Sequence, residues 1–384
     1  MILSNVPGSF AWEVFQRRHP ALIEQVRGAF PYPPARDEAL VRLAGESVSG
    51  VIRPLPRHAH EAGTWLEWGR DYLGQRWIDV PFLWAESYFY RRALEAVGYF
   101  AAGPWAGIDP FAPVKAAELD DPGLDGELAV VDRVLALPTS ERAEALLHAA
   151  LWGNRADLGF RILATATPTP AVADAASGLV ADDRPLLWSL LGDRPLQQTC
   201  LVGDNAGREL LSDLVLTDHL LTEQHAQTVS LHLKPHPYYV SDATTADLIA
   251  CLRRLITYPE RVGEVGVRWQ AMRTGRLTVY PHSFYCAPLT YHHMPSELAD
   301  QFTAASLTIM KGDLNYRRLV GDRHWPATLP FPAVTSYFPA LVVALRTLKS
   351  EVVVGVAQPT LDLLNATGHT WRTNGTHALI QVRT

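Results

Sequence analysis

Two adjacent polar residues, Asp204 and Asn205, follow directly on a short apolar run that ends at Gly203. After them, apolar residues recur at helical spacing from Leu210 to Leu221. This order predicts a buried strand, a tight turn and a helix, and in open α/β sheets ligands bind beyond the carboxyl ends of the strands. Asp204 could instead be only the N-cap of the helix, a common position for aspartate. On this segment alone both interpretations stay open.

Polar residues also stand at the ends of the other strands that the sequence predicts. Lys234, His236 and Asp242 follow the second strand, the segment 311–317 follows the fourth, and 346–349 precedes the fifth. Because the carboxyl ends of parallel strands lie along one edge of a sheet, we expect these residues to become neighbours.

The side chains expected at this edge suit a hard divalent cation and a phosphate group. Asp204, Asn205 and Asp242 offer two carboxylates and an amide oxygen, the ligand types that Mg²⁺ or Mn²⁺ prefers, and no His or Cys spacing typical of zinc is present. Lysine and arginine near such a cation suit a phosphate. Asp242 and Asp313 could also be helix N-caps, and Lys349 a solvated lysine. Together, the residues favour a metal-dependent enzyme that acts on a small phosphorylated substrate.

The elements that must position these residues change in kind along the chain. Up to about residue 160 the pattern is helical, and from about residue 198 it alternates between strands and helices, which predicts a mostly parallel, doubly wound sheet. The Ala/Thr/Pro-rich stretch 164–176 is the expected boundary, dividing the chain into 1–165 and 166–384. Helices are expected near 11–26, 37–48, 60–73, 81–98, 127–137, 140–151, 207–221, 244–256, 296–305 and 339–345, and strands near 199–202, 228–233, 277–280, 307–310, 351–356 and 378–382.

Aromatic residues are dense in the helix expected over 81–98, where a packed helical layer explains most of them. Glu86, Arg91 and Arg92 lie among these rings. A charge within an apolar face requires a partner, so we expect each of the three to be paired.

Composition limits the classes of function that remain. The 384 residues are 48% hydrophobic with a net charge of -6 and a pI near 6.2, which argues against a nucleic-acid-binding surface. Three isolated cysteines fit reduced core thiols better than disulfides. No signal peptide and no apolar run of ~18 residues is apparent. We therefore expect a cytoplasmic enzyme with no membrane and no obligate protein partner.

Six motifs identify a family that this chain resembles. They are FLWAESYFYRR (82–92), LWGNRADL (151–158), GDNAGRELLSDLVLTDHLL (203–221), VSDATTADL (240–248), KGDLNYRRLVGDRHW (311–325) and LRTLK (345–349). Their order and spread over almost the whole chain resemble the metal-dependent damage-control phosphatases, also called the domain of unknown function 89 family, and in particular its subfamily III, marked by an RTxK motif.

The resemblance implies a fold, a cofactor and a set of site residues. The fold would be α/β, with an N-terminal helical bundle packed on a three-layer α/β/α sandwich whose sheet is mostly parallel and Rossmann-like. Asp204, Asn205 and Asp242 would hold a divalent cation, Mn²⁺, Ni²⁺, Co²⁺ or Mg²⁺, and with Lys349 would form the catalytic set. Residues implied to contact the substrate and its phosphate are Glu86, Asn154, Glu209, Asp313, Leu314, Asn315, Tyr316, Arg317, Arg346 and Lys349.

The resemblance also implies an activity, the hydrolysis of small phosphometabolites, with fructose 1-phosphate and fructose 6-phosphate as typical substrates. Two alternatives remain open: an S-adenosylmethionine-dependent protein-glutamate carboxyl methyltransferase, and a sugar-phosphate-binding protein without catalysis. Asp157-Leu158 continues into Gly159-Phe160, whereas family members commonly continue into a DLSL segment. If that loop borders the pocket, we expect substrate preference to differ from that of relatives.

Overall fold

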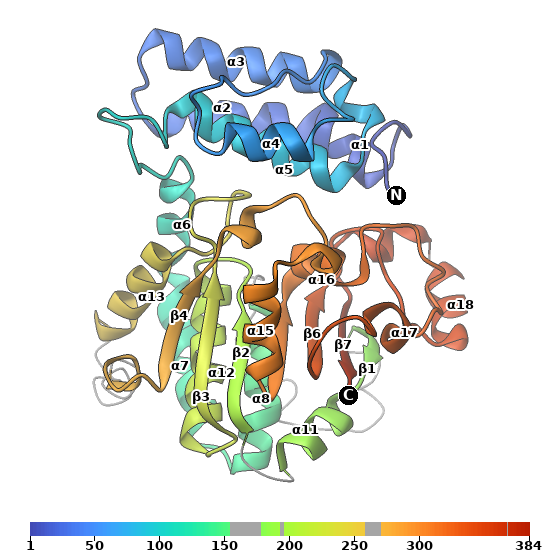
Figure 1. The fold of residues 1–384 in the computed structure, drawn as a ribbon. Helices are drawn as coiled ribbons and strands as arrows, with labels where there is room; N and C mark the ends of the chain where they lie inside the picture. Colours follow the sequence, from blue (N-terminus) through green and yellow to red (C-terminus); the bar gives the residue numbers. More distant parts are fainter. Residues whose placement is uncertain (154–177, 193–195, 258–269, 367) are drawn as a thin grey trace.

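The computed structural model describes residues 1–153, 178–192, 196–257, 270–366 and 368–384. A helical unit formed by the N-terminal helices lies on an α/β unit, at the end of the sheet where most strands finish (Figure 1). The mixed α/β fold with a mostly parallel sheet confirms the predicted fold class. The predicted boundary at 165, the stretch 164–176 and Asn154 lie outside the described residues, as does the segment that departs from the DLSL pattern.

The helical unit is built around an aromatic core to which nearly every helix contributes. Helix α5, which like α3 has 16 residues, lies between Pro81 and Gly98, and Gly98 ends the helix at φ +80°. Buried rings from α5 stack with others, including Trp77 on Tyr88 and His19 on Phe89. The elements are α1 (Phe10–Glu13), the π-helical η1 (Val14–Arg18), α2 (His19–Ala29), α3 (Pro34–Ser49), α4 (Ala62–Trp68), η2 (Trp77–Asp79) and α5 (Phe82–Val97).

Three further helices lead from this unit to the sheet. They are α6 (Ala112–Leu119), which the sequence pattern did not reveal, α7 (Gly123–Leu135) and α8 (Thr139–Trp152). The apolar residues of α7 and α8 share one core cluster with the sheet and with α12 (Arg208–Thr222). These two helices therefore cover a face of the sheet, behind it in Figure 1.

The sheet has seven strands in the order β1-β7-β6-β5-β2-β3-β4, all paired in parallel except β6 with β7. Along β2, Cys200 and Val202 face one apolar cluster and Leu201 faces the other, so both faces are buried. The strands are β1 (Leu179–Asp182), β2 (Leu196–Val202), β3 (Ala226–Leu233), β4 (Leu277–Pro281), β5 (Leu307–Lys311), β6 (Val342–Thr347) and β7 (Ala378–Arg383).

Helices on the two faces complete the three layers. They are α11 (Arg184–Gly192), α12, α13 (Thr245–Thr257), α15 (Ser296–Ala304), α16 (Gly312–Val320), α17 (Phe331–Thr335) and α18 (Gln358–Ala366), with short 3₁₀ turns η4 (Ser283–Cys286), η5 (Tyr291–His293) and η6 (His369–Arg372). Within the described chain, no helix has the length and apolar character required to cross a bilayer. The three cysteines are buried and unbridged, as expected.

Two predicted elements near the C-terminus are wrong. The helix expected over 339–345 is largely strand β6, because a short apolar run does not distinguish a buried strand from a helix. The strand expected over 351–356 is an extended segment outside the sheet. Its backbone groups bond to side chains and to a loop instead of a neighbouring strand. The Val352 carbonyl accepts from Arg346 and the Val354 carbonyl from Gln381, while the N–H groups of Gly355 and Val356 donate to carbonyls of the loop at 327–329.

The chain between β4 and α15 depends on one buried cation, Arg318 on α16. Its guanidinium donates to the carbonyl oxygens of Leu289 at 2.7 Å, Phe284 at 2.7 Å and Tyr285 at 3.2 Å. No solvent reaches the Arg318 side chain. Its removal leaves the Leu289 and Tyr285 carbonyls without this donor, while the Phe284 carbonyl still accepts from the Ala287 N–H at 3.0 Å.

We therefore expect Arg318→Leu to lower the free energy of unfolding by about 3 kcal/mol or more, since each buried polar group without a partner costs about 1–3 kcal/mol. Denaturant unfolding followed by circular dichroism measures the change. Arg323→Leu is the matched control, because Arg323 is exposed and only lies over the Trp325 ring. Equal, small effects of the two substitutions would contradict this account.

Candidate active site

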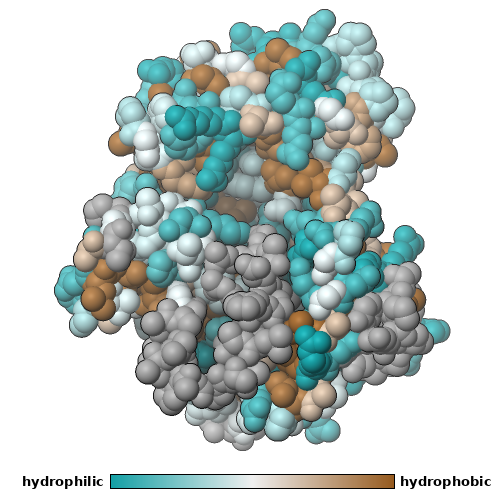
Figure 2. Space-filling model, turned by 180° about the vertical axis from the view of Figure 1, so that it is seen from behind, coloured by the Kyte–Doolittle hydropathy of each residue, from teal (hydrophilic) through white to brown (hydrophobic). Residues whose placement is uncertain are grey.

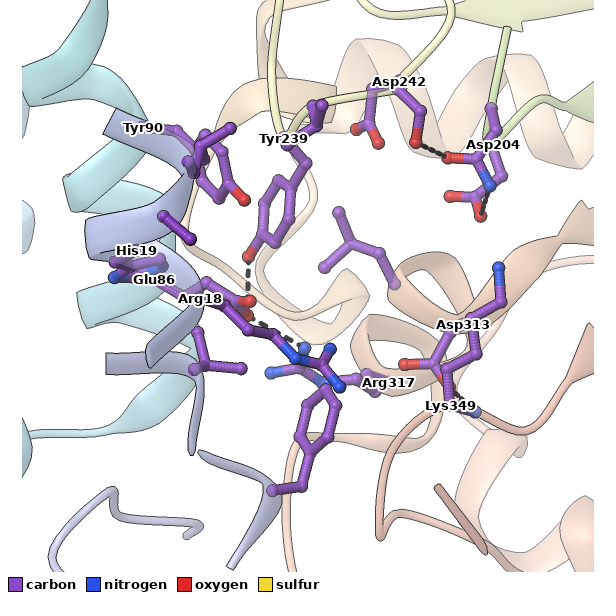
Figure 3. A pocket seen from close by; sticks show the side chains of 18 of the residues that line it. Arg18, His19, Glu86, Tyr90, Asp204, Tyr239, Asp242, Asp313, Arg317 and Lys349 are labelled. Atoms are coloured by element: carbon purple, nitrogen blue, oxygen red, sulfur yellow. Dashed lines mark hydrogen bonds and ion pairs between the residues drawn. The ribbon is translucent and has the colours of Figure 1, made fainter. Parts of the chain in front are cut away.

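A cavity of about 500 Å³ lies between the helical unit and the carboxyl edge of the sheet, a volume typical of small-molecule sites (Figure 3). Seen from the opposite side, the surface is indented at the level where the two units meet (Figure 2). The cavity is lined by Phe10, Val14, Arg18, His19, Ala21, Leu22, Gln25, Glu86, Tyr90, Asp204, Asn205, Tyr239, Val240, Ser241, Asp242, Asp313, Leu314, Arg317 and Lys349.

The loops after β2 and β3 hold Asp204, Asn205 and Asp242 beside one another. Asn205 and Asp242 form an antiparallel bridge, and the Ala243 N–H donates to the Asp204 carbonyl at 2.8 Å. Neither aspartate caps a helix. Gly207 precedes α12 without a side-chain cap, and the backbone N–H of Thr244 donates to Asp247 at the start of α13. The alternative interpretation of both residues as caps is therefore wrong.

The Asn205 amide is fixed between carboxylates and a hydroxyl. Its Nδ2 donates to Asp204 Oδ2 at 3.1 Å and to Glu209 Oε2 at 2.8 Å, while its Oδ1 accepts from Ser241 at 2.6 Å. The amide oxygen consequently points to the same side as the Asp242 loop.

Asp204 is packed against the start of α16. Gly312 has φ +81°, and a Cβ at that position would overlap the Asp204 carboxylate. Glycine is required here both by its backbone conformation and by this close approach.

The two aspartates are buried, with 6% of Asp204 and 3% of Asp242 exposed. Burial, with the nearby Glu209 and Asp242 carboxylates, raises the pKa of Asp204 well above its ordinary value. Burial also raises the pKa of Asp242, an effect that Lys234 Nζ at 3.3 Å from Oδ2 opposes. Such carboxylates need a cation to remain ionised.

The donor set fits a divalent cation, because Asp204, Asn205 and Asp242 offer only oxygen ligands. Asp242 Oδ2 accepts no hydrogen bond from the described residues, although Lys234 is ion-paired to it. No group of three or more His, Cys, Asp or Glu suited to a metal occurs in the described ranges. A site here would therefore take its third ligand from the Asn205 amide.

The chain contains only four lysines among its 34 lysine and arginine residues, and all four surround these aspartates. Lys234 pairs with Asp242, Lys115 Nζ donates to the Asp242 carbonyl at 2.9 Å, and Lys311 Nζ lies 3.4 Å from Glu209 Oε1. These three are 1–5% exposed. Lys349 alone lines the cavity, and its side chain extends toward Asp204 (Figure 3). The scarcity of lysine is a signal in the sequence that the motif-based prediction did not use.

The DLNYR segment is divided between the cavity and the core. Asp313, Leu314 and Arg317 line the cavity. Asn315 and Tyr316 lie behind its wall: Asn315 donates to the Gly203 carbonyl, and the Tyr316 hydroxyl donates to Gln381.

Asp313 is anchored by Arg346 and by the backbone of the RTxK motif. Arg346 Nη2 lies 2.7 Å from Asp313 Oδ1, which also accepts from the Lys349 N–H at 3.1 Å. Burial would raise the pKa of Asp313, but Arg346 and Arg317 bring it below its ordinary value. Asp313 does not cap α16, since that helix has no side-chain cap. Arg346 itself is fully buried and does not line the cavity; like Glu209, it orients residues that do.

Glu86 from α5 joins the helical unit to this cluster. Its Oε2 accepts from Arg317 Nη1 at 3.1 Å and from the Tyr239 hydroxyl at 3.2 Å, and burial raises its pKa. Tyr239 has φ +44°, an uncommon conformation for a tyrosine. Arg317 is also paired with Asp322 at 2.7 Å.

The expectation of partners for the charges of α5 is thus confirmed. Arg91 pairs with Glu95 at 3.0 Å, and Arg92 pairs with Glu46 at 3.2 Å.

The wall contributed by α1, η1 and α2 was missed by the sequence analysis. Phe10, Val14, Arg18, Leu22 and Gln25 recur three or four residues apart and face the cavity together. That periodicity was visible, but it is also the pattern of an ordinary core-facing helix. Tyr90 and Tyr239 were hidden in the same way among the aromatic residues.

The fold that holds this cavity also occurs in the family of domain of unknown function 89 proteins. The fold is shared with a solved member of that family from Pyrococcus horikoshii, with a TM-score of 0.51 and 13% identity over 96% of this chain and 99% of the other. The model of the damage-control phosphatase ARMT1-like domain matches residues 14–364, and the chain belongs to this family.

Relatives in several vertebrates carry the name damage-control phosphatase ARMT1. The proteins of Mus musculus and Bos taurus are both 31% identical to this chain, each over 86% of it and 82% of the relative. The Homo sapiens protein is 28% identical over 83% of this chain and 78% of its own length. Assignment to the RTxK subfamily remains a prediction, carried by residues 346–349.

Gly312→Ala should distinguish an effect on metal binding from an effect on the stability of the fold. Both Gly312 and Gly321 have φ +81°, but a Cβ meets Asp204 only at Gly312 and finds open space at Gly321. We expect each alanine substitution to lower the free energy of unfolding by roughly 1–3 kcal/mol. Only Gly312→Ala should weaken Mn²⁺ binding in isothermal titration. Equal Mn²⁺ binding by the two variants would show that Asp204 is not displaced or not a ligand.

Proposed function

We propose that this protein is a metal-dependent phosphomonoester hydrolase that acts on small phosphometabolites, with sugar phosphates such as fructose 1-phosphate or fructose 6-phosphate as its substrates. The observation that carries the proposal is the meeting of Asp204, Asn205 and Asp242 with Lys349 in one cavity. Family membership supports it, because the relatives are named damage-control phosphatases.

In this proposal Asp204, Asn205 and Asp242 hold one divalent cation, Mn²⁺, Ni²⁺, Co²⁺ or Mg²⁺. Bound there, the cation would supply Lewis-acid polarisation of the phosphate and activation of water. Burial of the two aspartates excludes competing water from the ligands and strengthens every charge interaction inside the site.

Lys349 binds the phosphoryl oxygens and offsets the charge that develops on them. It is suited to this because its backbone N–H is fixed on Asp313 while its side chain enters the cavity. Arg317 acts differently, because Asp322 and Glu86 already occupy three of its donors. Its main contribution is to hold Glu86 at the cavity wall.

Two further carboxylates, those of Asp313 and Glu86, line the cavity and can accept hydrogen bonds from the attacking water and from the hydroxyl groups of the substrate. Asp313 has a lowered pKa and stays ionised, so it can orient the attacking water by accepting a hydrogen bond from it. Glu86 uses Oε2 for Arg317 and Tyr239, and Oε1 is left to accept a hydrogen bond from a substrate hydroxyl.

A screen of phosphate release tests the proposal directly. Sugar phosphates and nucleotides are incubated with protein and Mn²⁺, Ni²⁺, Co²⁺ or Mg²⁺, with chelator as a control. Release that requires the cation supports the proposal. Binding of a sugar phosphate without any phosphate release across the panel would contradict the proposal and favour a binding protein without catalysis. Incorporation of a labelled methyl group from S-adenosylmethionine into acceptor proteins would favour a methyltransferase instead.

Asp204→Asn should lower kcat at least about a hundredfold, in line with the loss of one essential electrostatic group. The fold should remain stable, because the substitution removes a negative charge that is disfavoured by desolvation and by the nearby Glu209 and Asp242 carboxylates. We therefore expect an unfolding free energy no lower than that of the parent. Asp300→Asn, an exposed position on α15, is the control. Full activity in Asp204→Asn would refute the assignment of the ligand.

Because Lys349 is the one lysine that lines the cavity, amine-directed labelling reports on the site without any turnover. Trinitrobenzenesulfonate should modify Lys349 much faster than Lys115, Lys234 and Lys311, which are 1–5% exposed. Fructose 6-phosphate with Mn²⁺ should slow the modification of Lys349, as measured by peptide mass spectrometry. Lys349→Arg should abolish the fast reaction. Undiminished labelling at saturating ligand would place the phosphate elsewhere.

A further inference from the structure

Arg18, from the helical unit, lines the cavity, and the proposed hydrolysis gives it no role. It stands at the end of η1 (Val14–Arg18), a π-helical segment inserted directly between α1 and α2. The His19 N–H donates to the Val14 carbonyl five residues back, and Pro20 has no N–H with which to continue an α-helical ladder. Such π segments are often found at functional sites.

Arg317 is the one arginine or lysine lining the cavity that is ion-paired among the described residues, whereas Arg18 and Lys349 are not. Among the described residues no carboxylate lies within ion-pair distance of the Arg18 guanidinium, whose Cζ lies 4.9 Å from the centre of the Phe10 ring. Its sequence neighbour Arg17 pairs with Glu13 at 3.2 Å on the surface. Arg317 is neutralised by Glu86 and Asp322. Because Lys349 is assigned to the phosphate that is hydrolysed, Arg18 is the cation of the cavity that remains available to a second anionic group.

The position of Arg18 separates it from the proposed phosphate site. Arg18 lies over the Phe10 ring and Arg317 lies over the Phe82 ring at 4.7 Å, and the centres of these two rings are 6.0 Å apart. Arg18 thus stands at the end of the cavity where Arg317 lies. In Figure 3 it reaches from the helical unit toward Arg317, while Asp204 and Asp242 lie across the cavity. A phosphate held at Asp204 and Lys349 leaves Arg18 facing the opposite end of the ligand.

We propose that Arg18 is a specificity-determining residue that binds a second anionic group, a carboxylate or a second phosphate, at the end of the substrate remote from the phosphate that is hydrolysed. The inference rests on the proposed function. A guanidinium suits this task because its fork of donors matches both carboxylate and phosphate oxygens. The preferred substrates are then doubly anionic phosphometabolites, namely sugar bisphosphates or phosphorylated sugar acids, in preference to neutral-ended sugar monophosphates.

The test compares three probes that share a sugar-phosphate end: fructose 6-phosphate, fructose 1,6-bisphosphate and 6-phosphogluconate. For each, kcat/KM is measured with the parent protein, with Arg18→Leu and with Arg18→Lys. Arg17→Leu is the matched control, a neighbouring arginine whose side chain is 73% exposed and faces away from the cavity.

We expect Arg18→Leu to lower the ratio of kcat/KM for the doubly anionic probes over fructose 6-phosphate by about ten- to a hundredfold, the usual effect of losing a charged hydrogen bond. The loss should appear mainly in KM, and Arg18→Lys should restore part of the ratio. The two doubly anionic probes distinguish a second phosphate from a carboxylate. Arg17→Leu should leave the ratio unchanged.

An equal loss for all three probes, or a loss mainly in kcat, would show that Arg18 acts on the transferred phosphate and would overturn the proposal. An unchanged ratio would overturn it as well. If the parent protein releases phosphate from none of the probes, the proposed function fails. The role of Arg18 is then tested by the ratio of the Kd values of the same probes, which isothermal titration measures in the presence of Mn²⁺.

Discussion

The rest of this structure depends on one constraint: two buried carboxylates, those of Asp204 and Asp242, are held close together by a backbone bridge between their loops. Asp204 and Asp242 lie on loops joined by backbone hydrogen bonds, and both are nearly inaccessible to water. Buried charges of one sign require compensation. The chain concentrates that compensation here, since Lys115, Lys234, Lys311 and Lys349 are its only lysines. Three of them are ion-paired or hydrogen-bonded behind the aspartates, and the fourth enters the cavity.

The same constraint explains the close approach of α16. Because Gly312 has no side chain, the helix can begin against the Asp204 carboxylate. From that start, α16 sends Asp313 and Arg317 into the cavity and places Asn315, Tyr316 and Arg318 in the core. A single helix therefore fixes the RTxK loop through Asp313, holds Glu86 of the helical unit through Arg317, and secures the chain after β4 through Arg318.

The helical unit is part of the site and not only a cover for it. Glu86 and Tyr90 come from α5, and Phe10, Val14 and Arg18 come from α1 and η1. The aromatic core, with His19 stacked on Phe89, packs behind this wall. The α/β unit thus contributes three carboxylates and one lysine to the cavity, whereas the helical unit contributes mainly apolar side chains together with Glu86 and Arg18.

The sequence by itself determined the α/β class, the order of most strands and helices, and the residues at the strand ends, because these follow from local periodicity and from short motifs. It also required partners for Glu86, Arg91 and Arg92, since charges among rings cannot be left unpaired. It did not decide between strand and helix for 342–347, nor between strand and irregular structure for 351–356, because the backbone partners of these segments are distant in the chain. Only the tertiary structure decided which members of the DLNYR and RTxK motifs reach the cavity and which lie behind it. The same holds for the position of Arg18 at the end of the cavity where Arg317 lies, because packing between elements remote in sequence, and not any local pattern, places the Phe10 and Phe82 rings beneath them side by side.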